Sequence, residues 1–258
     1  MKKFSDKIYL SKNKRGVWAL DTVKGCKYGM RNNTKGCYGS CYAYRLATMF
    51  DYDFSTSITR KFKGGFHLAR ILDEIKSIDM DFLRIGVMGD PSECWDHTIG
   101  ICESISGTGK QVVIVTKHWE PISVKLYERI ENLNLIINTS VSALDGYLLE
   151  YRLAEYKKLK TICRSVLRVV SCDFNVNNVY GSEFNKIQEK LFENENVIDN
   201  VLRVSNDSVL VKSGVVNIEK YIFLGKESYI SRKNKDTYVG YCDGCPDRCG
   251  VNLFKDTK

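Results

Sequence analysis

The sequence is poor in the features that mark membrane, secreted or repetitive proteins. It has only three prolines in 258 residues, no Gly/Ser-rich linker, no low-complexity tract and no internal repeat. No segment is apolar enough to span a bilayer, and the basic residues near the N-terminus are not followed by the apolar stretch of a secretory signal. We therefore expect a packed globular protein that stays in the cytoplasm and has no membrane partner.

Cysteine content and charge narrow the class further. Ten cysteines would predict disulfides in a small secreted chain, but in a reducing compartment they favour metal binding or catalysis. The net charge is +8, with lysine and arginine spread along the whole chain rather than gathered in one block. This balance is compatible with a nucleic acid or another anionic partner without requiring one.

Strand-like and helical patterns alternate from about residue 16 to residue 205. The predicted strands are Gly16–Leu20, Phe82–Met88, Gln111–Thr116, Leu135–Ser140, Val166–Ser171 and a last one near Val201–Val204. The predicted helices are one that begins near Cys41, then His67–Ile78, Thr98–Ser106, Val124–Asn132, Leu148–Leu159 and Glu183–Phe192. Because parallel strands need a long crossover, usually a helix, six such units predict a parallel sheet.

We interpret this α/β pattern as a partial (β/α)6 TIM-like barrel. A doubly wound open sheet usually has a glycine-rich first turn, whereas here the first turn carries cysteines, and a complete eight-fold barrel needs about 250 residues. Residues 1–205 would form the barrel, and residues 206–258 a small C-terminal extension with cysteines of its own. In such folds the chemistry lies at the C-terminal ends of the strands.

Three cysteines lie in the loop after the first predicted strand, among several glycines. Cys26, Cys37 and Cys41 have the spacing C-x10-C-x3-C. Thiolates are the usual ligands of iron–sulfur clusters, and small residues between them let backbone amides approach the cluster. Three protein ligands would leave one iron of a four-iron cluster open to a small molecule.

The order of strand, cysteine loop, helix, strand and Gly-Asp-Pro resembles the start of a radical S-adenosylmethionine (SAM) enzyme. The common pattern of that superfamily is C-x3-C-x2-C followed by G-G-E-P after the second strand, and Met88–Pro91 (MGDP) is similar to the latter. The cysteine pattern departs from the common one, because Tyr44 stands where the third ligand is expected and Cys26 would have to replace it. The layout also resembles small radical-SAM-like proteins of phages and mobile elements.

This resemblance implies a [4Fe–4S] cluster on Cys26, Cys37 and Cys41, with SAM bound to its open iron and cleaved to a 5′-deoxyadenosyl radical. It also implies an external electron donor such as flavodoxin or ferredoxin. Asp90 would accept a hydrogen bond from the amino group of SAM. The other candidate cofactor contacts follow the predicted strands or lie within them: Gly89, Pro91, Lys117, Asn138, Ser140 and Arg168.

Other roles remain open for four of these candidates. Lys117 and Arg168 could contact an anionic group of SAM or of the substrate, or they could form structural ion pairs. Asn138 and Ser140 end a strand, where a radical SAM fold usually places a contact to the ribose, but both residue types are also ordinary turn formers.

A second cysteine group, Cys242-x2-Cys245-x3-Cys249, lies near the C-terminus. Close spacing with Gly, Pro and Asp between the cysteines is typical of a metal site. One interpretation is a structural zinc site completed by a fourth ligand, such as Cys26 or a histidine. The other is a second, auxiliary iron–sulfur cluster that binds substrate or relays an electron, and in both cases these cysteines are the ligands.

The leading hypothesis is therefore a radical SAM enzyme whose substrate is unidentified, with a nucleic acid or nucleotide-like molecule favoured by the basic composition. Two other classes compete with it. A non-enzymatic, zinc-binding, nucleic-acid-binding protein would contain zinc and have no affinity for SAM. An iron–sulfur electron-transfer or sensor protein would hold a fully ligated cluster that is indifferent to SAM.

Overall fold

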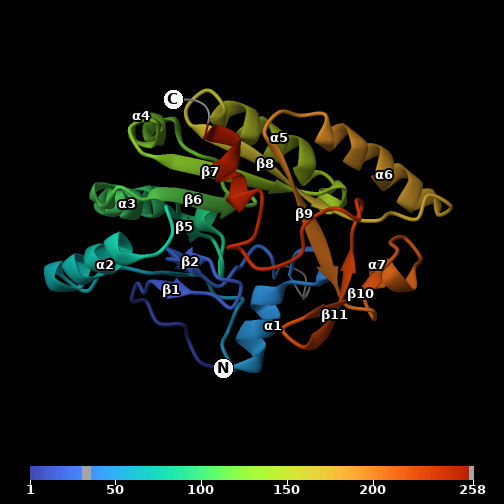
Figure 1. The fold of residues 1–258 in the computed structure, drawn as a ribbon, viewed down its shortest axis with the longest axis horizontal. Coiled ribbons are helices and arrows are strands. Elements are labelled where there is room, and N and C mark those ends of the chain that lie inside the picture. Colours follow the sequence, from blue (N-terminus) through green and yellow to red (C-terminus); the bar gives the residue numbers. More distant parts are fainter. Residues whose placement is uncertain (31–35, 256–258) are drawn as a thin grey trace.

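The computed structural model describes residues 1–30 and 36–255, and its centre is a mixed sheet (Figure 1). Within these residues nine strands follow the order β1-β2-β5-β6-β7-β8-β9-β11-β10. Their bounds are β1 Ser11–Lys12, β2 Trp18–Ala19, β5 Phe82–Ile85, β6 Gln111–Thr116, β7 Leu135–Val141, β8 Arg164–Ser171, β9 Val197–Val204, β10 Glu219–Phe223 and β11 Lys226–Ser231. A separate pair is formed by β3 (Val23–Lys24) and β4 (Ile58–Thr59).

Helices connect most of the neighbouring parallel strands. The α-helices are α1 Tyr42–Met49, α2 Gly65–Ser77, α3 Trp95–Ile105, α4 Tyr127–Glu131, α5 Leu148–Leu159, α6 Val179–Phe192 and α7 Val209–Lys212. The 3-10 turns are η2 Cys37–Gly39, η3 Pro91–Cys94, η4 Ser106–Thr108, η5 Val124–Leu126, η6 Ala143–Asp145 and η7 Arg248–Phe254. Two predictions match their elements residue for residue, the strand Gln111–Thr116 and the helix Leu148–Leu159.

The six predicted strands pair in parallel, in sequence order, from β2 to β9. This confirms the mostly parallel sheet with helical crossovers that the alternation predicts. In the described chain the sheet is open, with β1 at one edge and β10 at the other. Strand β1 and the hairpin β10–β11 join the parallel run in antiparallel fashion.

Side chains alternate between the two faces of the sheet, as the period of a strand requires. One face packs against α2 and α3, and its buried members include Leu83, Ile85, Val112, Ile114, Leu135 and Ile137. The opposite face gathers Phe82, Val113, Ile136, Val166 and Ile198 around Val251. Each such side chain contributes about 1.5–3 kcal/mol when it is removed from water.

The C-terminal segment is attached to this sheet at two places. Strand β11 pairs with β9, and η7 lies against β7, visible as the red ribbon beside that strand in Figure 1. Gly250 in η7 has a φ of 89°, and a Cβ there would lie 2.6 Å from a methyl carbon of Val166. The segment can approach β8 this closely only because residue 250 has no side chain.

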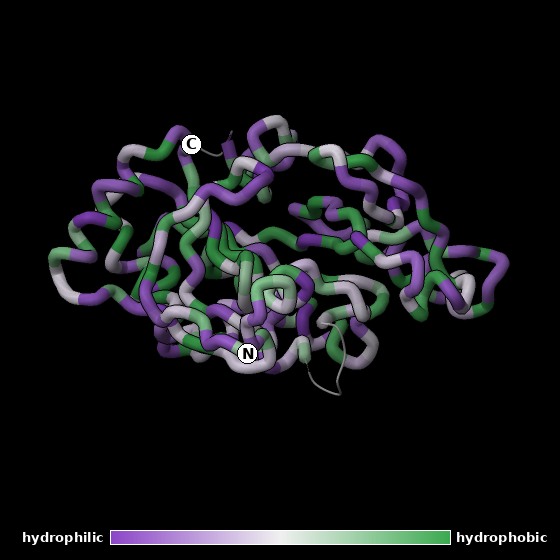
Figure 2. Tube along the Cα trace, turned by 90° about the horizontal axis from the view of Figure 1, so that it is seen from below, coloured by the Kyte–Doolittle hydropathy of each residue, from purple (hydrophilic) through white to green (hydrophobic). Residues whose placement is uncertain are grey.

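Hydropathy follows the same layering. Hydrophilic stretches dominate the outermost loops in Figure 2, whereas hydrophobic stretches lie mainly inside the molecule. Among the described residues, none of the helices combines the length and the apolar composition needed to cross a membrane.

Candidate functional site

The first cysteine group collects around two glycines. A Cβ at Gly29 would lie 3.0 Å from the Sγ of Cys26 and 3.7 Å from the Sγ of Cys37. A Cβ at Gly36 would lie 3.2 Å from the Sγ of Cys41. The fold therefore brings Cys26, which is distant in sequence, to the Cys37–Cys41 turn, and the glycines leave room for sulfur next to the backbone.

Backbone amides point at two of these sulfurs. The amide of Gly29 donates to the Sγ of Cys26 at 3.3 Å, and the amides of Ala43 and Tyr44 at the start of α1 donate to the thiol of Cys41. Hydrogen bonds from backbone N–H groups stabilise sulfur in its anionic form and tune the potential of a bound cluster. These donors favour the thiolate form of Cys26 and Cys41.

Burial acts against the charged form of the thiols in the first group. Burial raises the pKa of Cys37 to about 11, and it also raises the pKa values of Cys26 and Cys41. A metal cation lowers thiol pKa values and displaces these protons. The donor set thus fits a metal cluster with thiolate ligands, and the amide donors already stand beside the sulfurs.

The Gly-Asp-Pro stretch borders this group. The amide of Gly25 donates to the carbonyl of Met88 at 2.9 Å, and Gly25 and Gly89 form a parallel bridge. A Cβ at Gly89 would lie 2.4 Å from the carbonyl oxygen of Val23. Glycine is therefore required at position 89, where the end of β5 is joined to the chain that leads into Cys26.

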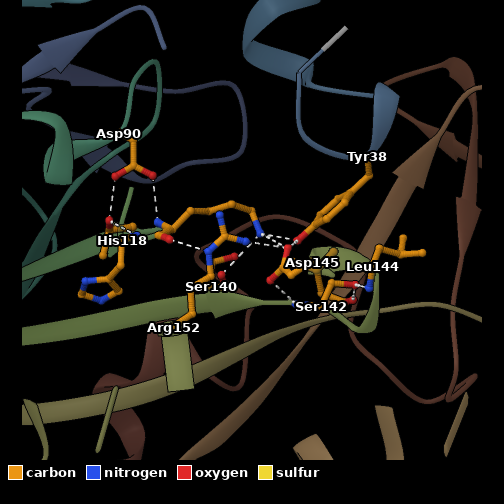
Figure 3. Close-up of polar contacts among 11 residues, drawn as sticks. Tyr38, Asp90, His118, Ser140, Ser142, Leu144, Asp145 and Arg152 are labelled. Atoms are coloured by element: carbon orange, nitrogen blue, oxygen red, sulfur yellow. Dashed lines mark hydrogen bonds and ion pairs between the residues drawn. The ribbon is translucent and has the colours of Figure 1, made fainter. Parts of the chain in front are cut away.

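The carboxylate of Asp90 is buried and already holds four protein donors. Its Oδ1 accepts from the amide and hydroxyl of Ser92, at 3.0 and 2.7 Å, and from the hydroxyl of Thr116 at 2.6 Å. Its Oδ2 accepts from the amide of Lys117 at 2.8 Å (Figure 3). Asp90 thus ties the end of β5 and Pro91 to the end of β6, and one lone pair of Oδ2 is left for a further donor.

A buried polar network connects the cysteine loop to β7 and α5. The carboxylate of Asp145 accepts from the hydroxyl of Tyr38, pairs with Arg152 at 2.6 Å and lies 3.5 Å from the ammonium of Lys117 (Figure 3). Burial alone would raise the pKa of Asp145, but Lys117 and Arg152 outweigh it and hold that pKa below its usual value. Burial lowers the pKa of Lys117.

The sequence prediction included Lys117 but missed the other three members of this network. Tyr38 lies inside the CYGSC motif, next to Cys37, and Asp145 follows the end of a predicted strand. Both positions could therefore have been recognised from the sequence as candidates for the site. Arg152 lies on a helix whose pattern gives no hint of a buried charge. Ser140 is near the same network, because its carbonyl accepts from the ammonium of Lys117 at 3.3 Å.

The second cysteine group lies against the face of the sheet that is opposite to α2 and α3, close to Val251. Cys242 and Cys249 pack with the side chains of that face, and the amide of Cys245 donates to the carbonyl of Cys242 at 3.3 Å. The thiol of Cys245 accepts from the amides of Asp247 and Arg248. This repeats the donor arrangement seen at Cys41.

Two predicted cofactor contacts lie beside the second cysteine group. The amide group of Asn138 donates to the carbonyl of Cys249 at 3.1 Å. Arg168 donates to the side-chain oxygen of Asn200 and interacts electrostatically with Cys249 and Cys245. Both residues face inward from the middle of their strands, so they lie further from the strand ends than Lys117 and Ser140.

No fourth ligand considered for the second group lies beside it. Cys26 is with Cys37, as described above. The ring of His67 accepts from the amide of Lys63, and His97 and His118 contact Arg60 and Thr139. Across residues 1–30 and 36–255, no three side chains of His, Cys, Asp or Glu form a group that could hold a single metal ion.

Comparisons with known proteins point to one fold. No protein-family model matches the sequence, and no curated protein matches it. A variant of spore photoproduct lyase with bound AdoMet and dinucleoside spore photoproduct has a TM-score of 0.55 and 12% identity, covering 88% of this chain and 72% of that one. A second lyase structure, complexed with dinucleoside spore photoproduct, has a TM-score of 0.52 and 13% identity, covering 87% and 71%. At these identities the likeness concerns the fold.

Proposed function

We propose that this protein is a radical SAM enzyme whose [4Fe–4S] cluster is held by Cys26, Cys37 and Cys41. The observation that carries the proposal is that the sulfurs of Cys26 and Cys37 both lie close to Gly29, in the same loop as Cys41. Gly25, next to Cys26, forms a bridge with Gly89 of the Gly-Asp-Pro stretch. The fold shared with spore photoproduct lyase, whose solved variant binds AdoMet, supports the same conclusion. When bound, the reduced cluster supplies the electron that cleaves SAM to a radical that abstracts hydrogen.

The chain's own residues would bind and orient SAM in this proposal. Gly89, Asp90 and Pro91 border the cluster loop, and Asp90 keeps an acceptor position for the amino group of SAM. Lys117 is a buried cation close to Cys37, and we assign it to an anionic group such as the SAM carboxylate. Ser140 lies beside Lys117 and completes this side of the site. An external donor such as flavodoxin or ferredoxin would supply the electron.

We further propose that Cys242, Cys245 and Cys249 hold a second metal centre. The amide donors on Cys245 support thiolate ligation, and the group is seated in the protein by contacts from β7. Because no fourth protein ligand from the candidates above lies nearby, an auxiliary iron–sulfur cluster is favoured over a structural zinc site, which is almost always four-coordinate. Asn138 and Arg168 are assigned to this centre instead of to SAM.

The architecture is proposed to be a partial (β/α)6 TIM-like barrel formed by residues 1–205, with residues 206–258 as an extension. Side chains from β5, β6, β7, β8 and β9 share one hydrophobic cluster with Val251, which supports a curved sheet around the C-terminal segment. Such a barrel would place the cluster loop at its mouth and the second cysteine group in its interior.

The test is anaerobic purification with iron, sulfide and zinc analysis, followed by electron paramagnetic resonance of the dithionite-reduced protein with and without SAM. A [4Fe–4S]⁺ signal that shifts on addition of SAM is expected. Zinc without such a signal would favour a nucleic-acid-binding module, and a signal indifferent to SAM would favour an electron-transfer or sensor protein. Either result contradicts the proposal.

Three cysteine variants separate the two centres. Cys37→Ala is expected to abolish the SAM-sensitive signal, whereas Cys245→Ala is expected to leave it intact and to remove the iron of the second centre. Cys163→Ala is the matched control, since Cys163 lies outside both groups and packs with the hydrophobic core. Equal loss of the SAM-sensitive signal from Cys37→Ala and Cys245→Ala would point to one shared metal site.

A further inference from the structure

Four arginines interact with the second cysteine group or with one another on its side of the sheet. Arg84 lies in β5, Arg168 in β8 and Arg203 in β9, while Arg15 precedes β2. Arg84 interacts electrostatically with Cys242 and Cys249, Arg168 with Cys245 and Cys249, and Arg203 with Cys242. Each of these side chains is half-buried rather than sealed in the core.

This arginine cluster reaches toward the first cysteine group through one side chain. Tyr42, which directly follows Cys41, interacts electrostatically with Cys41, Arg84 and Arg168. Tyr42 is 45% exposed as a whole residue. Arg84 and Arg168 therefore interact both with the second cysteine group and with the exposed residue that follows Cys41.

None of the four arginines takes part in an ion pair within the described residues. Their hydrogen bonds go to neutral oxygens: Arg15 donates to the carbonyl of Gly240 at 2.9 Å and Arg168 to an asparagine. Arg84 donates through Nη2 to the carbonyl of Gly86 at 3.4 Å. Its buried Nε has no hydrogen-bond partner in the part of the chain that the structure describes. A buried guanidinium donor without an acceptor costs about 1–3 kcal/mol or more, so an acceptor placed there would stabilise the protein.

Two carboxylates interact with the arginines without forming an ion pair with them among the described residues. Asp21 interacts with Arg84 but is already hydrogen-bonded to the amides of Val87 and Met88, at 2.7 and 3.1 Å. Asp247 interacts with Arg168.

The arginines also repel one another. Arg168 interacts unfavourably with Arg84 and Arg15, and Arg203 with Arg15. Packing holds them in place, since β5, β8 and β9 belong to one sheet and Arg15 is held by Gly240. Such a like-charge arrangement is stabilised when an anion with several acceptor oxygens lies among the guanidinium groups.

We propose that Arg84, Arg168 and Arg15 bind a phosphate group of the substrate. Phosphate suits this set better than carboxylate, because its oxygens can accept from several guanidinium groups at once and it carries more negative charge. Tyr42 would direct the remainder of the substrate from this anchor toward Cys41. The inference deepens the proposed function, since it names the substrate class of the same site, and it rests on that function for the chemistry.

The experiment measures binding to the anaerobic holoprotein of three probes: a mononucleotide, a short single-stranded oligonucleotide and citrate. The phosphate-bearing probes are expected to bind, and Arg168→Gln or Arg84→Gln is expected to weaken binding by about tenfold or more. Arg84→Lys should retain part of the affinity. Arg70→Gln is the matched control, because Arg70 is an exposed helix residue paired with Glu74, and it should bind like the parent protein.

The two sources of phosphate are separated by the probes themselves. Comparable affinity for the mononucleotide and the oligonucleotide identifies a free phosphorylated molecule, and binding of the oligonucleotide alone identifies a nucleic-acid strand. Citrate binding in the absence of phosphate binding overturns the proposal. Unchanged phosphate binding in both glutamine variants, with native circular dichroism, also overturns it.

Failure of this inference is distinguishable from failure of the proposed function. The arginine variants are expected to keep the SAM-induced shift of the electron paramagnetic resonance signal, because the cluster ligands Cys26, Cys37 and Cys41 are untouched. A parent protein that binds phosphate but shows no SAM-induced shift would contradict the radical SAM assignment and leave the arginine site supported. A parent protein that shows the shift but binds no phosphate probe would contradict the arginine site and leave the radical SAM assignment supported.

Discussion

The hydroxyl of Tyr38 donates to the carboxylate of Asp145, which joins the cysteine loop to the turn after β7 (Figure 3). Tyr38 has a φ of 60°, a left-handed backbone conformation that is uncommon for a residue with a side chain. Its neighbour Cys37 is one of the proposed cluster ligands. The hydrogen bond therefore fixes the position of that cysteine relative to the sheet.

Replacing Tyr38 by Phe is expected to lower the free energy of unfolding by about 1–3 kcal/mol, because a buried hydrogen bond to a charged group is lost. Chemical denaturation of the protein checks this value. The iron content after anaerobic reconstitution should fall as well, since the Cys37 turn is less well held. Tyr180→Phe is the control, because Tyr180 is 64% exposed. Loss of its hydroxyl group should change neither the free energy of unfolding nor the iron content.

Removing the cation of the buried Arg152–Asp145 pair should lower the free energy of unfolding more than Tyr38→Phe does. Both side chains are 1% exposed, so Arg152→Met leaves a buried carboxylate with less compensation and is expected to cost about 3–5 kcal/mol. Denaturant titration provides the measurement. The exposed pair Lys160–Glu195 offers the matched comparison: Lys160→Met should cost about 0–1 kcal/mol. Similar losses of unfolding free energy in the two variants would contradict the conclusion that the Arg152–Asp145 pair is buried and stabilising.

The same pair predicts a dependence of stability on acidic pH. The pKa of Asp145 is held below its usual value in the folded protein, so in the unfolded state this group binds a proton more readily. Its contribution to stability is present above about pH 4 and is lost as the pH falls through the folded-state pKa. Asp145→Asn should flatten the stability profile in this window, and an unchanged slope would argue against the network.

His118 adds a second pH effect at less acidic values. Its side chain is fully buried, with Nε2 3.0 Å from the hydroxyl of Thr139, and burial lowers its pKa to about 3. Since the unfolded state takes up a proton near pH 6.5, stability should fall progressively as the pH drops from about 6.5 toward 3. The slope of unfolding free energy between pH 6.5 and 5 should be smaller in His118→Gln than in the parent or in His97→Gln.

Gly89→Ala should disrupt the junction between β5 and the cysteine loop. The new Cβ would lie 2.4 Å from the carbonyl oxygen of Val23 and 2.8 Å from that of Gly25, and these backbone atoms cannot move independently. A loss of about 1–3 kcal/mol is expected from overpacking, together with weaker SAM binding in equilibrium titration. Gly107→Ala has no atom within 4 Å of the new Cβ and should be close to neutral.

Local patterns in the sequence were sufficient to predict the parallel sheet. The alternation in Gln111–Thr116 and the helical spacing in Leu148–Leu159 arise from side chains that face a core, and the elements match. The first strand was predicted as Gly16–Leu20 but is only Trp18–Ala19. Strand pairing there depends on β5 and β1, which the local sequence does not specify.

The sequence by itself determined the strand and helix order and the close spacing of Cys242, Cys245 and Cys249, because both depend on residues a few positions apart. The sequence also predicted that Cys26 joins Cys37. Only the tertiary structure decided that Arg168 faces the second cysteine group and that Asp145 pairs with Tyr38. These contacts join residues far apart in the chain. They depend on strand register and on which face each side chain occupies, and the register is set by packing of the whole sheet.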